Sequence, residues 1–397
     1  MTSPNTLLSP ADVSASRLVK FHAPEIVFGL NSLAEAGYAA ARLGARRPFV
    51  VTDPGLLEAG WVSELVSHLR QAGLSPLVWN DITPNPKEYE IARGFECYLD
   101  SGGDVIVGIG GGSVLDAAKG IAILSGNGAQ ILDYAGVDQV IHPIPPLLMI
   151  PSTAGSGSDV SQFCIITDTS HAVKVTIMGR AVVPDISLTD PRLLTTMPQD
   201  LAAATGLDAL THAIESYVSL GHNLLADGHA LSAARLVSTS LQRIVESPAD
   251  TDARMSMAQA SLEAGLAFSN AILGATHAMS HQVGGLLDLP HGVVNGVLLP
   301  HVIRFNAEVV PERFAALAQA MGLPVADVPA DVAAEMLAVQ VQQLAETVGV
   351  PPGLRELGVH QDNIERLSTT AMHDACLATN PRPVSHADLV TIFQAAL

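Results

Sequence analysis

Four histidines are concentrated in one apolar segment of the sequence. His277, His281, His291 and His301 lie among leucine, valine and glycine within residues 274–306. Histidine is usually exposed or only partly buried, so such a cluster indicates a specific task. His277 and His281 are four residues apart, which on a helix places both rings on one face. His291 stands in a turn-like Pro-His-Gly, from which a loop can direct its imidazole toward that face.

A second segment, residues 206–215, has the same spacing. Asp208 and His212 lie four residues apart in it. One carboxylate and three or four imidazoles on helical faces are suitable ligands for a divalent transition metal with open coordination positions. The two segments together therefore predict a metal site.

A glycine-rich turn follows a predicted buried strand over residues 104–109. Residues 110–113 read Gly-Gly-Gly-Ser and open a predicted helix. Glycine lets backbone N–H groups approach a phosphate, and the start of a helix carries partial positive charge. Asp116 and Lys119 in the first turns face the same opening. The pattern predicts a pyrophosphate site, with a glycine turn selected only for packing as the alternative.

Two further features fit a dinucleotide. Asp53 follows a predicted strand over residues 48–52, where a carboxylate can hydrogen-bond a ribose diol and repel a 2′-phosphate, which favours NAD over NADP. The alternative is an aspartate that only initiates the Pro-Gly turn after it. The loop over residues 152–159 is rich in hydroxyl groups that can contact phosphate or nicotinamide. A serine nucleophile is the competing interpretation of that loop, but the GxSxG pattern is absent.

The bulk composition restricts the class of protein. With 397 residues and 48% hydrophobic residues, the chain is long enough for two well-buried cores. Its 20 basic and 39 acidic residues give a net charge of −19, which disfavours nucleic acid and anionic membranes as partners. The three cysteines form no CxxC motif and indicate buried thiols in a reducing compartment. The polar lead over residues 1–16 lacks the pattern of a signal peptide, so we expect a cytoplasmic protein.

The periodicity of the chain changes near residue 193. Before it, short apolar runs alternate with helical patterns, which predicts parallel βαβ units. After it, apolar residues recur every three or four positions, as in residues 224–244 and 255–273. We therefore expect an α/β dinucleotide-binding domain over residues 1–193 and an all-helical metal-binding domain over residues 194–397.

Five motifs, in order, resemble those of the iron-containing (group III) alcohol dehydrogenases. They read GGGSVLDAAK, STAGSGSD, GLDALTHAIESY, HAMSHQVGG and LPHGVVNGVLLPHV, and the resemblance extends from Phe21 to Leu397. It implies the dehydroquinate synthase-like fold of that family, with the active site in the cleft between the two domains. One departure is Asp159, where the family usually has glutamate; its carboxylate reaches one methylene less far.

The resemblance also implies roles for individual residues. The metal ligands would be Asp208, His212, His277 and His291. His281 would lie near the nicotinamide and the substrate, where it could relay a proton. The residues expected along the cofactor are Asp53, Asn85, Gly111, Gly112, Ser113, Asp116, Thr153, Ser156, Lys174 and Leu193. His301 and His373 receive no such role.

The function that follows from the resemblance is hydride transfer between NAD(H) and a small primary alcohol or aldehyde. Fe(II) is the expected metal, and Zn(II) suits aspartate and histidine ligands nearly as well. We also expect a homodimer or a larger homo-oligomer. Two alternatives stay open: a glycerol-dehydrogenase-like polyol enzyme, and an alcohol-dehydrogenase-like regulatory or sensor protein with little turnover, such as the member linked to regulation of ethanol oxidation, which part of the wording resembles.

Overall fold

The N-terminal half is built on a parallel sheet. The computed structural model describes residues 19–171 and 173–397, so the polar lead expected over residues 1–16 lies outside the described residues. The sheet has six parallel strands in the order β1-β9-β6-β4-β2-β3. Their bounds are β1 Glu25–Phe28, β2 Pro48–Val51, β3 Leu77–Trp79, β4 Val105–Gly110, β6 Leu147–Pro151 and β9 Ile186–Thr189.

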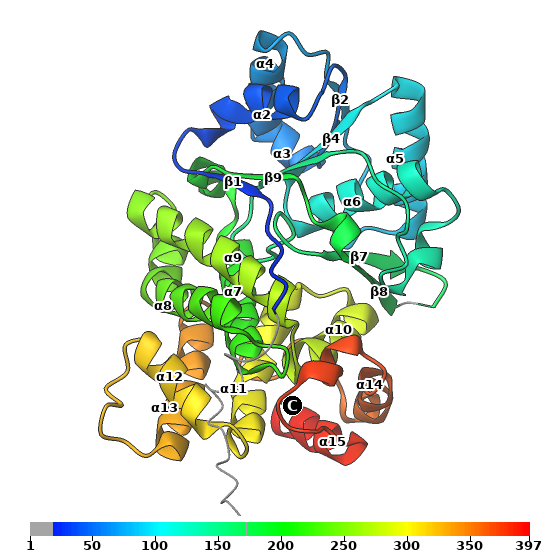
Figure 1. Ribbon diagram of the computed structural model, residues 1–397. Helices are drawn as coiled ribbons and strands as arrows, with labels where there is room; N and C mark the ends of the chain where they lie inside the picture. Colours follow the sequence, from blue (N-terminus) through cyan, green and yellow to red (C-terminus); the bar gives the residue numbers. More distant parts are fainter. Residues whose placement is uncertain (1–18, 172) are drawn as a thin grey trace, which may run out of the picture.

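Helices cover both faces of this sheet (Figure 1). On one face, Val50 and Val107 share a core with α2 (Ala36–Arg42) and α4 (Trp61–Gln71); on the other, Phe49 and Ile106 share a core with α5 (Glu88–Ser101) and α6 (Gly112–Asn127). The four residues of β2 are all buried, as are the six of β4. Uninterrupted burial is the pattern of parallel strands covered on both sides, so the predicted strands were recognisable as apolar runs.

The order of connections creates a crevice at the carboxyl edge of the sheet. After β2 the chain passes through the short helix α3 (Pro54–Glu58) into α4, on one face, whereas after β4 it enters α6 on the other face. Adjacent strands whose helices leave to opposite faces open a gap between their carboxyl ends, which is where open α/β sheets bind ligands. Asp53 and the glycine-rich turn both lie at this edge.

A small second sheet was not predicted from the sequence. The strands β7 (Phe163–Asp168) and β8 (Val173–Met178) form an antiparallel hairpin, and β5 (Gly136–Val137) pairs with β8. Residues of β7 alternate between buried and half-buried. The hairpin follows the hydroxyl-rich loop and lies beside the helical half, so it forms a wall of the space between the halves.

The C-terminal half is helical (Figure 1). The passage from sheet to helices runs through residues 190–198, and the predicted domain division at 193/194 stays a prediction. None of the helices among the described residues is both long and apolar enough to span a bilayer. The helices are α7 Gln199–Val218, α8 Leu224–Glu246, α9 Thr251–Ala271, α10 Ala275–Leu287, α11 His291–Ala307, α12 Pro311–Ala320, α13 Ala330–Thr347, α14 Ile364–Ala371 and α15 His386–Ala395.

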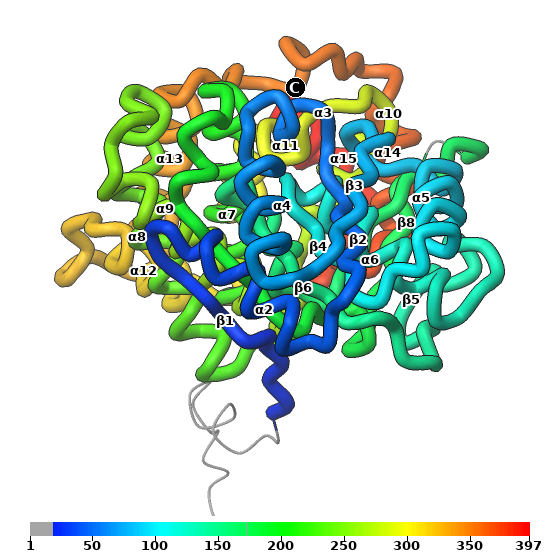
Figure 2. Tube along the Cα trace, turned by 90° about the horizontal axis from the view of Figure 1, so that it is seen from above, coloured from blue at the N-terminus to red at the C-terminus, as the bar shows by residue number. Residues whose placement is uncertain are grey.

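Helix α7 lies at the centre of this half and is buried along most of its length. Figure 2 shows from above how the sheet half overlies the helical half. Close approach to α7 is possible because its neighbours present glycine. A Cβ on Gly155 would lie 2.2 Å from the carbonyl oxygen of Thr205, and a Cβ on Gly292 would lie 1.8 Å from that of Ala204. Through Gly155 the α/β half contacts α7, and through Gly292 α11 contacts it.

We expect Gly292→Ala to destabilise the protein by at least about 1–3 kcal/mol, because the added methyl group forces α11 away from α7. Thermal and urea denaturation followed by circular dichroism measure the change. Gly228→Ala in α8 is the matched control: apart from the local backbone of α8, no described atom lies within 4 Å of its added Cβ, so better helix propensity should stabilise it by about 0.5–1 kcal/mol. A Gly292→Ala protein as stable as the control would contradict the close contact.

Candidate functional site

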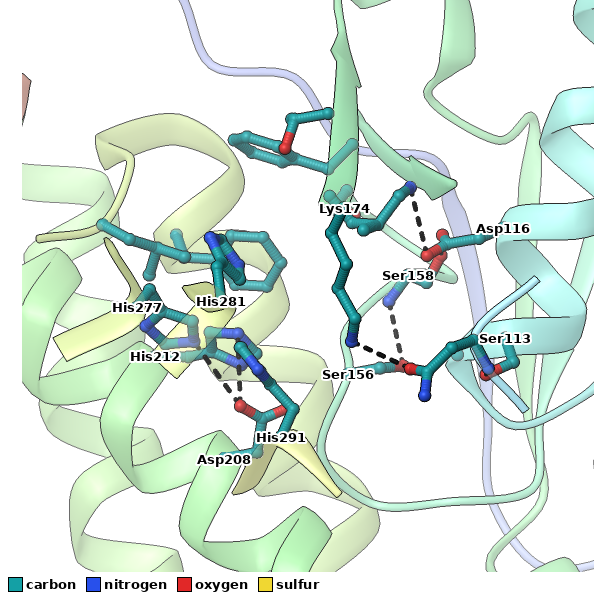
Figure 3. Close-up of a pocket in the computed structure, with 18 of the residues that line it drawn as sticks. Ser113, Asp116, Ser156, Ser158, Lys174, Asp208, His212, His277, His281 and His291 are labelled. Atoms are coloured by element: carbon teal, nitrogen blue, oxygen red, sulfur yellow. Dashed lines mark hydrogen bonds and ion pairs between the residues drawn. The ribbon is translucent and has the colours of Figure 1, made fainter. Parts of the chain in front are cut away.

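A cavity of about 180 Å³ lies between the two halves. Figure 3 shows that its helical side carries the histidines and Asp208, while serines, Asp116 and Lys174 face them from the α/β side. The cavity therefore brings the two predicted sites together in one place. Its wall includes these sequence-predicted residues: Asn85, Gly112, Ser113, Asp116, Ser156, Lys174, Asp208, His212, His277, His281 and His291.

Three helices supply the candidate metal ligands. Helix α7 carries Asp208 and His212, α10 carries His277, and His291 is the first residue of α11. Asp208, His277 and His291 each offer a ligand atom within 4.8 Å of the others. His212 lies just outside that group, with Nε2 3.8 Å from Oδ1 of Asp208. His291 was expected in a loop. It is instead the first residue of α11, directly after the N-cap residue Pro290.

Two of these histidines are oriented by oxygen acceptors. Nδ1 of His212 lies 3.1 Å from the carbonyl oxygen of Gly155, and Nδ1 of His277 lies 2.6 Å from Oε2 of Glu215. A carbonyl or carboxylate only accepts hydrogen bonds, so Nδ1 carries the hydrogen in both rings. Nε2 then points toward Asp208, at 3.8 Å for His212 and 3.5 Å for His277. A ring held through Nδ1 by an oxygen, with Nε2 left for a cation, is the usual arrangement of a metal-bound histidine.

Burial determines the charge of the cluster. Burial lowers the pKa of His212 to about 4, so this ring is neutral. Burial also opposes protonation of His277, but its hydrogen bonds with Asp208 and Glu215 outweigh that effect and raise its pKa to about 9. Asp208 and Glu215 likewise keep a lowered pKa despite burial, because histidine and amide donors surround them. Two buried carboxylates thus favour a positive charge at the centre of the cluster.

His291 and Asn295 complete the cluster from α11. Burial and the neighbouring histidines lower the pKa of His291 well below its usual range, and its buried Nδ1 has no hydrogen-bond partner among the described residues. Nδ2 of Asn295 lies 2.8 Å from Oδ1 of Asp208 and 3.2 Å from Nε2 of His277. The neutral rings of His212 and His291, beside the buried carboxylate of Asp208, fit a divalent transition metal and fit no anion.

On the α/β side, the predicted phosphate turn is packed against the hydroxyl-rich loop. A Cβ on Gly112 would lie 2.7 Å from the Cβ of Ser156, so only glycine permits this contact. Ser113 accepts a hydrogen bond from the backbone N–H of Asn85 at 3.1 Å. The start of α6 therefore meets the cavity with its backbone N–H groups and a hydroxyl, which suits a phosphate.

Next to this turn lie two buried ionisable side chains, Asp116 and Lys119. Asp116 accepts from the Ser158 hydroxyl at 2.5 Å, and Lys119 donates to the carbonyl oxygens of Ser161 and Phe163 at 2.8 and 2.7 Å. Burial raises the pKa of Asp116 and lowers that of Lys119. Asp116 thus fastens α6 to the hydroxyl-rich loop, and Lys119 fastens it to the segment just after that loop. Asp116 also reaches the cavity wall, whereas Lys119 does not.

A hydrogen bond crosses the cleft at its mouth. Nδ2 of Asn85 donates to Oδ1 of Asp288 at 2.5 Å, and Lys174 donates to Oδ1 of Asn85 at 2.8 Å. Asn85 and Asp288 both have positive φ, 56° and 50°. Asparagine and aspartate tolerate this left-handed conformation better than other residues with a side chain. The two halves are therefore linked next to the predicted cofactor path.

Other predicted residues do not line the cavity. Asp53 caps α3, with its carboxylate accepting from the backbone N–H of Leu56 at 2.9 Å. Leu193 is buried, and Gly111 and Thr153 lie side by side behind the wall, with a Cβ on Gly111 3.3 Å from Thr153. Asp159, where the sequence departs from the family pattern, is also buried. Its shorter carboxylate accepts a hydrogen bond from the Ser187 hydroxyl at 2.7 Å and so has a partner in the sheet.

Sequence reasoning missed several residues that support the histidines. Glu215 lies within a motif that was recognised, seven residues after Asp208, yet its contact with His277 needs the packing of α10 on α7. Asn295 could have been identified from its spacing, because it lies one helical turn after His291. Asp374, 2.8 Å from Nδ1 of His281, has no local signal. The ring of Phe268 stacks on His212 with centroids 4.3 Å apart.

Comparison with known sequences agrees with this arrangement. Residues 23–191 match the iron-containing alcohol dehydrogenase family, and residues 202–397 match its C-terminal part. The chain is 38% identical to the 1,3-propanediol dehydrogenase of Citrobacter freundii over 96% of this chain and 99% of that one. It is 37% identical to the NAD-dependent methanol dehydrogenase of Bacillus methanolicus, over 95% and 99%.

The fold also agrees with solved structures. A 1,3-propanediol oxidoreductase, 38% identical, superimposes with a TM-score of 0.94 over 96% of this chain and all of that one. An α/β half with a parallel sheet, followed by a helical half, was the fold predicted from the sequence, and it is confirmed. The chain belongs to the iron-containing alcohol dehydrogenase family.

Proposed function

We propose that this protein transfers hydride between NAD(H) and a small primary alcohol or aldehyde, at the cavity between its two halves. The supporting observation is one continuous wall that joins a phosphate-binding helix start to a buried Asp–His cluster. Family membership gives the oxidoreductase class. The small cavity suits a short substrate, and few basic residues line it, which favours an uncharged one.

Asp208, His212, His277 and His291 would hold the metal, with Fe(II) as the first choice and Zn(II) as the second. A divalent cation bound there would polarise the oxygen of the alcohol or aldehyde. Glu215 and the carbonyl of Gly155 fix the rings of His277 and His212 through Nδ1, so both Nε2 atoms are directed at one point. Asn295 holds the Asp208 carboxylate in place. The helical half thus supplies a preorganised electrophilic site.

The α/β half would bind and orient the dinucleotide. Gly111, Gly112 and Ser113 would receive the pyrophosphate, and the other predicted cofactor residues would lie along its path. NAD would supply the hydride acceptor, and the protein positions it. His281 on α10 faces the cavity beside His291, with the two rings stacked 4.9 Å apart. It would exchange the hydroxyl proton of the substrate with solvent.

The first test is NADH oxidation by protein loaded anaerobically with Fe(II), against a panel of short aldehydes and diol-derived aldehydes. Protein loaded with Zn(II) and metal-free protein are the controls. Turnover that requires metal supports the proposal and ranks the substrates. Absence of turnover with every aldehyde, while NADH still binds, would overturn it in favour of a regulatory protein. The same purified protein shows by sedimentation whether the expected homo-oligomer forms.

We expect Asp208→Ala to lose at least about 1,000-fold in kcat, because it removes the one carboxylate in the proposed metal set. Binding of NADH, measured by fluorescence titration, should change by less than about threefold, since the phosphate turn is intact. Asp250→Asn, at the cap of α9, is the control for a distant aspartate. Equal losses of turnover and NADH binding would point to misfolding and would not support a ligand role.

We expect Glu215→Gln to weaken metal retention by about 10- to 100-fold, the usual effect of removing a partner that orients a ligand. Elemental analysis after dialysis against a graded chelator series measures this change. Glu263→Gln, which removes the partner of His229 outside the cluster, is the matched control. If both variants retain metal as the unaltered protein does, Glu215 has no part in holding it.

Asp53 would hydrogen-bond the adenosine ribose with the carboxylate oxygen that does not cap α3. We expect Asp53→Ser to raise kcat/KM with NADPH by about tenfold or more, because serine keeps the cap while it removes the charge that repels a 2′-phosphate. Steady-state kinetics with NADH and NADPH on the same preparation measure the ratio. An unchanged ratio would place the ribose elsewhere.

A further inference from the structure

His281 has a carboxylate partner that does not belong to the proposed metal set. Nδ1 of His281 lies 2.8 Å from Oδ2 of Asp374, and both side chains are 14% exposed. Burial opposes ionisation of Asp374, but the contact with His281 and the backbone N–H of Cys376 outweigh it and lower its pKa. An ionised carboxylate only accepts, so the hydrogen of the His281 ring lies on Nδ1. In the neutral ring, Nε2 at the opposite edge is then the acceptor nitrogen.

Asp374 is itself fixed from two directions. Its Oδ1 accepts from the backbone N–H of Cys376 at 2.9 Å, as the cap of a short 3₁₀ helix over residues 375–379. Its Oδ2 also lies 3.4 Å from Nε2 of Gln282, the residue next to His281. The carboxylate therefore has little freedom to turn away from the ring.

The capped segment is fastened to the start of the helix that carries His281. The Thr379 hydroxyl donates to the carbonyl oxygen of Leu273 at 2.6 Å, and Oδ1 of Asn380 accepts from the backbone N–H of Ala275 at 3.1 Å. These contacts hold residues 374–380 against α10. The distance from Asp374 to His281 is thus set by the packing of the C-terminal segment and not by chance rotation of an exposed side chain.

The other side of the ring is fixed as well. His281 stacks on His291 with centroids 4.9 Å apart and an angle of 14° between the planes. Stacking sets the plane of the imidazole, and the hydrogen bond to Asp374 sets its rotation within that plane. Figure 3 shows the resulting position of His281 beside the other histidines of the cavity.

We propose that Asp374 is a positioning residue for the reaction: it holds His281 in the tautomer that presents an unprotonated Nε2 to the substrate side of the cavity. This inference rests on the proposed function. In alcohol oxidation the hydroxyl proton passes to an acceptor at Nε2, and in aldehyde reduction it returns from there. The opposite tautomer would present an N–H at Nε2 that could not accept that proton, and in aldehyde reduction it would leave the ring as an anion on donating it.

Asp374→Asn separates this role from that of a cap. Asparagine caps a helix as well as aspartate does. When its Oδ1 accepts from Cys376, its NH₂ group faces His281 and moves the ring hydrogen to Nε2. We expect kcat for NADH-dependent aldehyde reduction by the Fe(II)-loaded protein to fall by about 10- to 100-fold, by analogy with the partners that orient metal-bound histidines. KM for NADH, metal content and melting temperature should stay nearly unchanged.

A double-mutant cycle with His281→Ala tests whether Asp374 acts through His281. In that background, Asp374→Asn should have no further effect on kcat. The same fold-loss in both backgrounds would show a structural role and overturn the proposal, as would an unchanged kcat in the single variant. Asp250→Asn, which alters another capping aspartate, is the matched control and should have normal kcat.

A readout without turnover keeps the inference separate from the proposed function. The ¹⁵N shifts of histidine-labelled, Zn(II)-loaded protein report which ring nitrogen carries the hydrogen. We expect His281, assigned by its absence in His281→Ala, to be protonated at Nδ1 in the unaltered protein and at Nε2 in Asp374→Asn. A hydrogen on Nε2 in the unaltered protein would overturn the positioning role, even if the enzyme is active. Inactivity of the unaltered protein with the expected tautomer would instead overturn the proposed function alone.

Discussion

Two carboxylates buried in one helix are the constraint on which the site depends. Asp208 and Glu215 lie two turns apart on α7, and each is almost completely removed from solvent. A buried charge is costly unless it is paired. The pairing comes from α10, whose His277 bridges the two carboxylates, and from α11, whose Asn295 contacts Asp208. The packing of three helices and the chemistry of the site therefore satisfy the same requirement.

Glycine makes this packing possible. Gly155 and Gly292 allow two different segments to reach the backbone of α7 within one turn of each other. The first brings the hydroxyl-rich loop of the α/β half, together with the carbonyl that orients His212. The second brings the start of α11 and with it His291. A side chain at Gly155 would push the α/β half away from α7, and one at Gly292 would push α11 away from α7, so these glycines define the geometry together with the histidines.

The sheet contributes by its topology. The helices that follow β2 and β4 lie on opposite faces of the sheet, which opens the crevice that holds the predicted phosphate turn. The β7–β8 hairpin places Lys174 opposite Asp288. The proposed cofactor side and the proposed metal side thereby form opposite walls of one cavity. The link from Asn85 to Asp288 joins two residues of positive φ and gives the cleft a defined width before a substrate enters.

Much of this could be predicted from the sequence, because the signals are local. Apolar runs with glycine or proline at their ends identified β2, β4 and β6, and the spacing of four identified the faces that carry His277 and His281. The β7–β8 hairpin was missed, although its β-branched, alternating residues are typical of strands, because only fully apolar runs were interpreted as strands. His291 was expected in a loop because its Pro-His-Gly context is typical of turns, whereas here the proline begins a helix.

The sequence by itself determined the family and the order of an α/β half and a helical half, and it identified the candidate side chains for metal and phosphate. These follow from residue types and short spacings, which act through backbone geometry over one or two turns. Only the tertiary structure decided the partners of those side chains. Glu215 meets His277 across 62 residues, and Asp374 meets His281 across 93. Such contacts arise from helix packing, where burial requires that each polar group find a partner, and no local pattern specifies which one.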